Sequence, residues 1–124
     1  IIWGGCGYLA FSFLPALGLP PELPGMAAGD LAGRQTWWLM TAASSAGGIA
    51  LILLAPKWAF RVLGVALLIM PHFVGAPHPH EFDGNVPAEL AAQYVTASLV
   101  TAGLFWLLLG GLVGQFIDRG LSAE

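Results

Sequence analysis

The chain has 124 residues, of which 57% are hydrophobic and 9% are charged, and its formal net charge is −3. A soluble domain carries about a quarter charged residues because its surface faces water, so this composition excludes an ordinary soluble domain. The four basic residues also exclude a surface that binds nucleic acid by charge.

Four apolar segments predict an all-α fold, a polytopic transmembrane helical bundle of about four spanning helices. The predicted helices cover residues 1–19, 35–55, 58–76 and 91–117. Pro15 is expected to kink the first helix near its end, and Pro56 is expected to stop the second. The first segment lacks a basic leader and a small-residue cleavage site, which favours a membrane helix over a signal peptide. Residues 1–124 therefore make a single membrane domain.

Two polar loops, residues 20–34 and 77–90, connect these helices and are expected on the same side of the membrane. The basic residues expected on the other side are Lys57, Arg61 and Arg119. Only Arg34 accompanies the two loops. The positive-inside rule then places the turn between the second and third helices and the C-terminus in the cytoplasm, so both loops face outward.

The segment around the second loop concentrates potential metal ligands. The candidates there are His72, His78, His80, Glu81 and Asp83. An extended His-x-His segment puts both imidazoles on one side, and carboxylates add hard ligands, so the set could hold cobalt, nickel or zinc. The alternative is a proline-rich loop with solvated histidines. His72, beside Pro71 at a helix end, could instead pack, bond to a backbone carbonyl or ligate a tetrapyrrole metal.

Glu22 is the sixth candidate ligand, because prolines fix it at the expected membrane surface. It could meet an incoming cation, or form an ion pair with Arg34 that anchors the loop. The ion pair is the simpler interpretation.

Small and hydroxyl side chains share one face of the second helix and one face of the fourth. These residues are Thr41, Ser44, Ser45 and Gly48, and then Tyr94, Ser98, Thr101, Gly103, Gly110 and Gly114. Such faces let membrane helices pack closely, which is the simpler interpretation, and a polar transport path is the alternative. The expected mid-membrane positions hold no Asp, Glu or Lys, and the sequence contains neither a phosphate-binding loop nor a nucleophile–base arrangement. We therefore expect no ATP-driven motor, no enzyme and no catalytic residue.

Two blocks of sequence resemble a known family. The first is PALGLPPELPG at residues 15–25, followed by Asp30-Leu31, Arg34-Gln35 and Trp37-Trp38. The second is Pro71-His72, Gly75-Ala76-Pro77, VPAEL at residues 86–90, Ala97-Ser98-Leu99 and Leu104-Phe105-Trp106. In this order they resemble the CbtA family of predicted cobalt transporter subunits over most of residues 15–110.

The resemblance implies a bacterial inner-membrane protein of five or six helices, tied to cobalt or cobalamin supply and paired with a small His-bearing partner subunit. The chain looks like the C-terminal two-thirds of such a protein. The residues that match the family's pattern by position are Glu22, Arg34, Gln35, Trp37, Trp38 and His72. His78 and His80 lie in a more variable part.

Two functions follow as hypotheses. The first is a membrane subunit of a cobalt or other divalent-metal uptake transporter, with the outward loops in the periplasm and with the bilayer and the His-bearing subunit as partners. The second is a non-catalytic accessory subunit of a larger membrane complex, for example a photosynthetic or respiratory one. The absence of expected buried charge and the small-residue faces favour the second.

Overall fold

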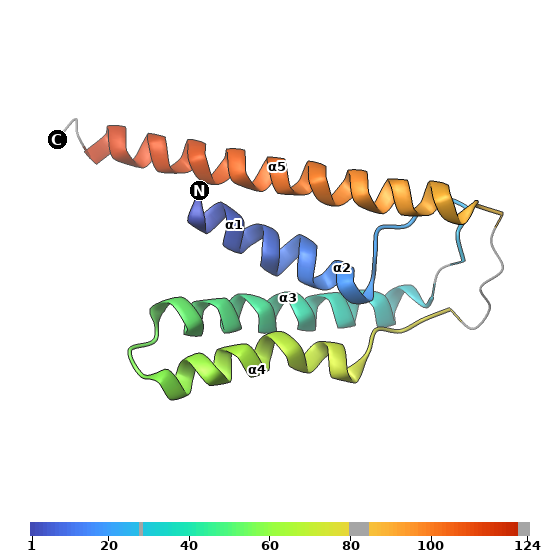
Figure 1. Cartoon of the computed structure of the whole chain (residues 1–124), viewed down its shortest axis with the longest axis horizontal. Helices are drawn as coiled ribbons and strands as arrows, with labels where there is room; N and C mark the ends of the chain where they lie inside the picture. Colours follow the sequence, from blue (N-terminus) through green and yellow to red (C-terminus); the bar gives the residue numbers. More distant parts are fainter. Residues whose placement is uncertain (28, 80–84, 122–124) are drawn as a thin grey trace.

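The computed structural model describes residues 1–27, 29–79 and 85–121, and this part of the chain contains helices and no strand. This composition confirms the all-α prediction, and the helices run side by side as long rods (Figure 1). The elements are α1 (Ile2–Tyr8), η1 (Leu9–Phe13), α2 (Leu14–Gly18), α3 (Leu31–Leu54), α4 (Trp58–Val74) and α5 (Ala88–Leu121). The first three follow one another directly and form the first rod.

The first rod contains a π-helical turn, η1, where the sequence predicts a simple proline kink. The N–H of Leu14 donates to the carbonyl of Leu9, five residues back. The turn ends at Phe13, two residues before Pro15, which has no N–H to donate to the carbonyl of Phe11. The irregularity therefore takes the form of a wider helical turn just before Pro15 rather than a simple kink.

The helix α3 begins four residues before its predicted start because Asp30 caps it. The Oδ2 atom of Asp30 accepts a hydrogen bond of 2.8 Å from the N–H of Gly33, and such a cap satisfies a backbone donor that the helix leaves unpaired. At the other end the chain becomes extended at Ala55. Arg61 Nε donates to the Ala55 carbonyl at 3.1 Å, so this side chain closes the turn into α4.

The helices α4 and α5 differ from their predicted ends in opposite directions. A positive φ of 82° at Gly75 ends α4 two residues early, because glycine adopts this conformation without a Cβ clash. The longer helix α5 extends the predicted range by about one turn at each end, through Glu89 and Arg119. Apolar patterning locates the stretch that lies in hydrocarbon, whereas charged residues with good helix propensity continue the helix beyond it.

Two of the helices, α3 and α5, are long and apolar enough to cross a membrane. The first rod (Ile2–Gly18) and α4 are apolar but shorter, near the lower limit of about 17 residues for a spanning helix. The number of crossings, expected to be four, stays a prediction.

The rods pack as two glycine-mediated pairs. In the antiparallel pair α3–α4, a Cβ at Gly64 would lie 2.6 Å from the carbonyl oxygen of Gly48, so only glycine permits this approach. In the pair α1–α5, a Cβ at Gly110 would lie 2.8 Å from the backbone of Gly4. The first rod lies between α5 and the α3–α4 pair, with α1 against α5, η1 against α3, and α2 against α3 and α4 (Figure 1).

Candidate functional site

The two polar segments that connect the rods lie together at one end of the bundle (Figure 1). A Cβ at Gly29 would lie 3.5 Å from the carbonyl oxygen of Pro77 and from the backbone of His78, and Gly33 also faces Pro77. The turn between α3 and α4 lies at the opposite end with the last turn of α5. The loop that carries Glu22 and the loop that carries His78 therefore form one surface, which we call the loop end.

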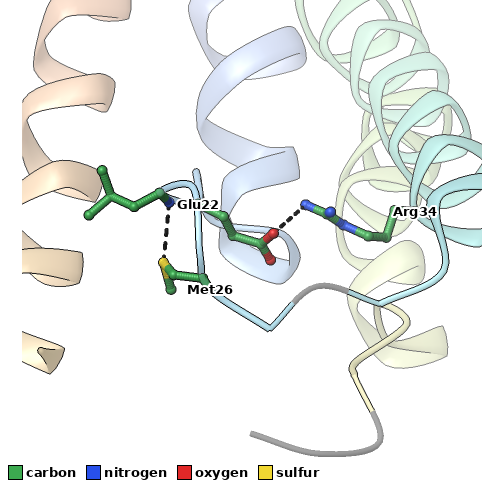
Figure 2. A network of polar contacts seen from close by, with 4 residues as sticks. Glu22, Met26 and Arg34 are labelled. Atoms are coloured by element: carbon green, nitrogen blue, oxygen red, sulfur yellow. Dashed lines mark hydrogen bonds and ion pairs between the residues drawn. The ribbon is translucent and has the colours of Figure 1, made fainter. Parts of the chain in front are cut away.

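An ion pair fixes the first of these loops. Figure 2 shows the carboxylate of Glu22 reaching back to Arg34 in the first turn of α3, with Oε2 and Nη2 2.9 Å apart. Both side chains are about a fifth to a quarter exposed. The N–H of Leu23 donates to the sulfur of Met26 at 3.2 Å, which tightens the same loop. This geometry agrees with the simpler interpretation, an ion pair that anchors the loop.

A cleft of about 770 Å³ opens beside the ion pair. Its walls come from α3, from α5 and from the η1–α2 part of the first rod, and Glu22 and Arg34 lie at its polar end. The lining is mainly apolar, with hydroxyl groups from Ser12 and Ser98. The cleft separates α3 from α5, whose backbone in the described residues comes close only to α1 and η1.

The interior of the bundle contains a row of polar side chains on α3. Thr41 and Ser45 have no exposed surface, and Trp37 is 5% exposed. Their spacing of four residues puts them on one face of the helix. The Trp37 Nε1, Thr41 Oγ1 and Ser45 Oγ atoms are all buried without a hydrogen-bond partner. A buried polar group left without a partner costs about 1–3 kcal/mol, so three in one row need a physical explanation.

Three other hydroxyl groups on these helices donate hydrogen bonds to backbone carbonyls of their own helix. Thr36 donates to the carbonyl of Ala32 at 2.8 Å, and Thr96 donates to that of Ala92 at 3.0 Å. Ser44, next to the buried row, donates to the carbonyl of Thr41 at 3.1 Å. Such local bonds are available to any helical Ser or Thr. The two fully buried hydroxyls, which would gain most from these bonds, do not make them.

His72 completes the row from α4. Its ring meets that of Trp37 edge-on, with centroids 6.0 Å apart, and its Nε2 atom is buried without a partner. The Trp37 ring also packs closely on Gly18 of α2, where a Cβ would collide with it, and that position lies beside Ala76. His72 therefore lies at the junction of α2, α3 and α4, directly behind the loop end.

The structure describes three of the six predicted metal ligands and places them in different surroundings. Glu22 pairs with Arg34, His72 faces Trp37 in the interior, and His78 is exposed in the loop. The other three, His80, Glu81 and Asp83, lie outside the described residues. Among the described residues no three His, Cys, Asp or Glu side chains come together as a metal-binding group. The six-residue metal set stays a prediction.

Sequence reasoning identified part of the interior row and missed part of it. The hydroxyl face of α3 was expected to serve close packing, and Gly48 does so against α4. Close packing does not explain Thr41 and Ser45, whose hydroxyls are buried without partners. Trp37 was noted only for its resemblance to the family's pattern, although its position one turn before Thr41 was a signal that it shares the buried face.

Comparison with known proteins identifies a family for this chain. The family model described as "Probable cobalt transporter subunit (CbtA)" matches residues 1–118. The likeness therefore takes in the first rod as well as the two blocks found within residues 15–110. No curated protein and no solved structure matches the chain.

Proposed function

The chain belongs to the CbtA family of probable cobalt transporter subunits, and from that premise we propose that it takes part in the uptake of cobalt across a bacterial inner membrane. Membership of the family supports a membrane subunit of a transporter. The direction of transport, the inner membrane and the small His-bearing partner subunit belong to our proposal. The observation that supports it best is the loop end, where two polar loops meet above apolar helices.

The charge of the loop end suits a divalent cation. Most of the acidic residues belong in sequence to this end: Glu22, Asp30, Glu81, Asp83 and Glu89. Arg34 is the only basic residue among these loops, and Glu22 pairs with it. Excess negative charge raises the local concentration of cations and speeds their arrival. Cobalt accepts imidazole ligands, which the exposed His78 can offer.

The same asymmetry supports an orientation. Lys57 belongs to the α3–α4 turn, Arg61 to the first turn of α4 and Arg119 to the last turn of α5, all at the end opposite the loop end. Basic residues are retained in the cytoplasm during insertion. We therefore propose that the loop end faces the periplasm, where it meets incoming cobalt.

Cobalt accumulation in cells tests the proposal. The full-length protein would be expressed with the neighbouring small His-bearing subunit in a host without its own cobalt uptake, and radioactive cobalt would be counted in washed cells. We expect accumulation above the empty vector and a reduction in a His78→Ala, Glu22→Ala variant. The control is Thr96→Val, because Thr96 is exposed on α5 and bonds to its own helix. Wild-type protein that reaches the membrane but accumulates no more cobalt than the vector would overturn the proposal.

A second function has one observation in its favour. None of the described residues of α5 is buried, although the helix runs for 34 residues. An apolar helix that buries so little of itself suits an accessory subunit that docks onto a larger photosynthetic or respiratory complex. Purification from the native membrane in a mild detergent separates the two functions. Stoichiometric foreign subunits with pigment or haem would support the accessory role, whereas a complex containing only the small His-bearing subunit would support the transporter.

A further inference from the structure

The buried row behind the loop end has a use that close packing does not supply. We propose that Trp37, Thr41 and Ser45 of α3, with His72 of α4, form a hydrated transit site for a divalent cation. The inference rests on the proposed transport function and adds the interior residues that the cation would pass.

The first step of the argument is that these four buried polar atoms have no hydrogen-bond partner among the described residues. All four are buried and unpaired, and hydrocarbon around the bundle offers no hydrogen bonds. Exposed Thr36 and Thr96 bond to their own helix, so the same solution was open to Thr41 and Ser45. Hydroxyls that leave it unused remain free for water or for a hydrated ion.

The second step is that the spacing of the row fits single bridging waters. Residues four apart on a helix are separated by about 6 Å along its axis, from a rise of about 1.5 Å per residue. Two O–H···O hydrogen bonds of about 2.8 Å span the same distance. The spacing of Thr41 and Ser45 would admit one bridging water, and another could accept from Trp37 Nε1 and reach His72 Nε2. The three side chains of α3 extend over about 12 Å of the helix, from the turn beside His72 towards the middle.

The third step concerns the backbone around the row. Pro15 and Pro71 are fully buried, as are Thr41 and Ser45. Pro71 cannot donate to the carbonyl of Leu67, which leaves one more acceptor on α4. Interrupted helices whose free carbonyls meet an ion are a recurring feature of transporter sites, and π-helical turns such as η1 are frequent at functional sites. The first rod and α4, which both pack against α3, are thus irregular helices, as is frequent around transporter sites.

The fourth step is the strength of the site. His72 Nε2 is the one nitrogen of the row that can ligate a first-row metal, since the indole N–H of Trp37 only donates. The row has no carboxylate, so a divalent charge would be only partly compensated and would keep some of its waters. A conducting site must bind weakly enough to release its ion. A row without carboxylates, placed behind the acidic loop end, would bind a divalent cation weakly enough to release it.

The test combines water labelling with uptake, on the full-length protein with its small partner subunit. In lipid nanodiscs, hydroxyl radicals generated by X-rays mark side chains close to bound water. We expect strong labelling of Trp37 and weak labelling of Trp106, whose indole N–H already donates to Ser12. Cobalt(II) chloride should protect Trp37 from labelling.

A Thr41→Val, Ser45→Ala variant should lower Trp37 labelling to the level of Trp106. It should also reduce cobalt uptake about tenfold, the lower bound for the loss of groups around a metal site.

The matched control is the Thr36→Val, Ser44→Ala variant, which makes the same chemical changes on the same helix at hydroxyls that bond locally. It should keep wild-type labelling and uptake. The single variants Thr41→Val and Ser45→Ala serve if the double variant does not fold.

Each failure has a distinct meaning. Trp37 labelled as weakly as Trp106 in the wild type, no protection by cobalt, or normal uptake by the Thr41→Val, Ser45→Ala variant would each overturn the transit site. Wild-type protein without uptake would instead overturn the proposed transport function, and labelling with cobalt protection would still decide whether the site exists.

Discussion

The two helix pairs of the molecule have similar glycine crossings but differ in whether their polar groups are hydrogen-bonded. Both α3–α4 and α1–α5 cross where glycines let the backbones touch, at Gly48 and Gly64 in one pair and at Gly4 and Gly110 in the other. Next to the α1–α5 crossing, the indole N–H of Trp106 on α5 donates to Ser12 Oγ of η1 at 3.1 Å. In α3–α4, by contrast, the interior row leaves its polar atoms unpaired.

This difference suggests that one pair has a structural role and that the other binds water or a ligand. A pair whose polar groups satisfy one another is complete as it stands, and its function is to position the first rod against α5. A pair whose buried polar groups lack partners is complete only when water or a ligand is present. The proposed transit site would place the chemistry of the protein in α3–α4 and leave a structural role to α1–α5. Substitutions that act on one pair at a time can break or sharpen this assignment.

The largest effect is expected at the crossing of α3 and α4. In a Gly64→Ala variant the new Cβ would lie 2.6 Å from the carbonyl oxygen of Gly48 and 3.2 Å from the backbone nitrogen of Ile52. Backbone atoms cannot move aside as a side chain can, so the helices must separate, and we expect a loss of about 1–3 kcal/mol in the free energy of unfolding. Denaturant unfolding in detergent micelles measures it.

The control for this substitution is Gly47→Ala, because a Cβ at Gly47 meets nothing within 4 Å. That change should be neutral, or should stabilise the helix by up to about 1 kcal/mol through the higher helix propensity of alanine. Equal stability of the two variants would show that α3 and α4 do not approach at Gly64.

A smaller effect is expected at the crossing of α1 and α5. In Gly110→Ala the Cβ would lie 2.8 Å from both the nitrogen and the Cα of Gly4. Gly4 belongs to the first turns of the rod, which can shift more easily than the middle of α3, so we expect a cost of about 1 kcal/mol. Hydrogen–deuterium exchange should rise in α1 and stay unchanged in α3 and α4, because the atoms nearest to a Cβ at Gly110 belong to Gly4 and Ile1.

Gly114→Ala is the matched substitution on α5, since a Cβ at Gly114 also meets nothing within 4 Å. It should leave the exchange of α1 unchanged. Faster exchange in α3 caused by Gly110→Ala would contradict the separation of the two pairs.

The sequence predicted the helices well and the interior poorly, for a physical reason. Apolar stretches long enough for hydrocarbon are a property of the local sequence, so four rods could be expected from it. Helix ends depend on single contacts, such as the Asp30 cap and the positive φ of Gly75, and they moved by a few residues. The π-helical turn before Pro15 depends on how the first rod packs, which local patterning does not contain.

The candidate site shows the same limit. The ion pair of Glu22 and Arg34 could be anticipated, because both residues flank one loop. The contact between Trp37 and His72 joins α3 to α4 and depends on the register that Gly48 and Gly64 impose. A hydroxyl's bonding state is likewise invisible in sequence: Thr36 and Thr41 look equivalent there, yet only the former bonds to its helix.

The smallest effect is expected from the loss of the hydrogen bond between Trp106 and Ser12, beside the α1–α5 crossing. Trp106→Phe removes the hydrogen bond to Ser12 but retains an aromatic ring against Phe11, whose ring stacks on the indole at 15° with centroids 5.8 Å apart. Hydrogen bonds between membrane helices are worth about 0.6 kcal/mol on average, and we expect a loss of that size. A double-mutant cycle with Ser12→Ala, followed by thermal unfolding in detergent, isolates the bond from the lost ring area. A coupling energy of zero would mean that the α1–α5 pair is held by its glycine crossing alone, and satisfied polar contacts would then no longer distinguish it from α3–α4.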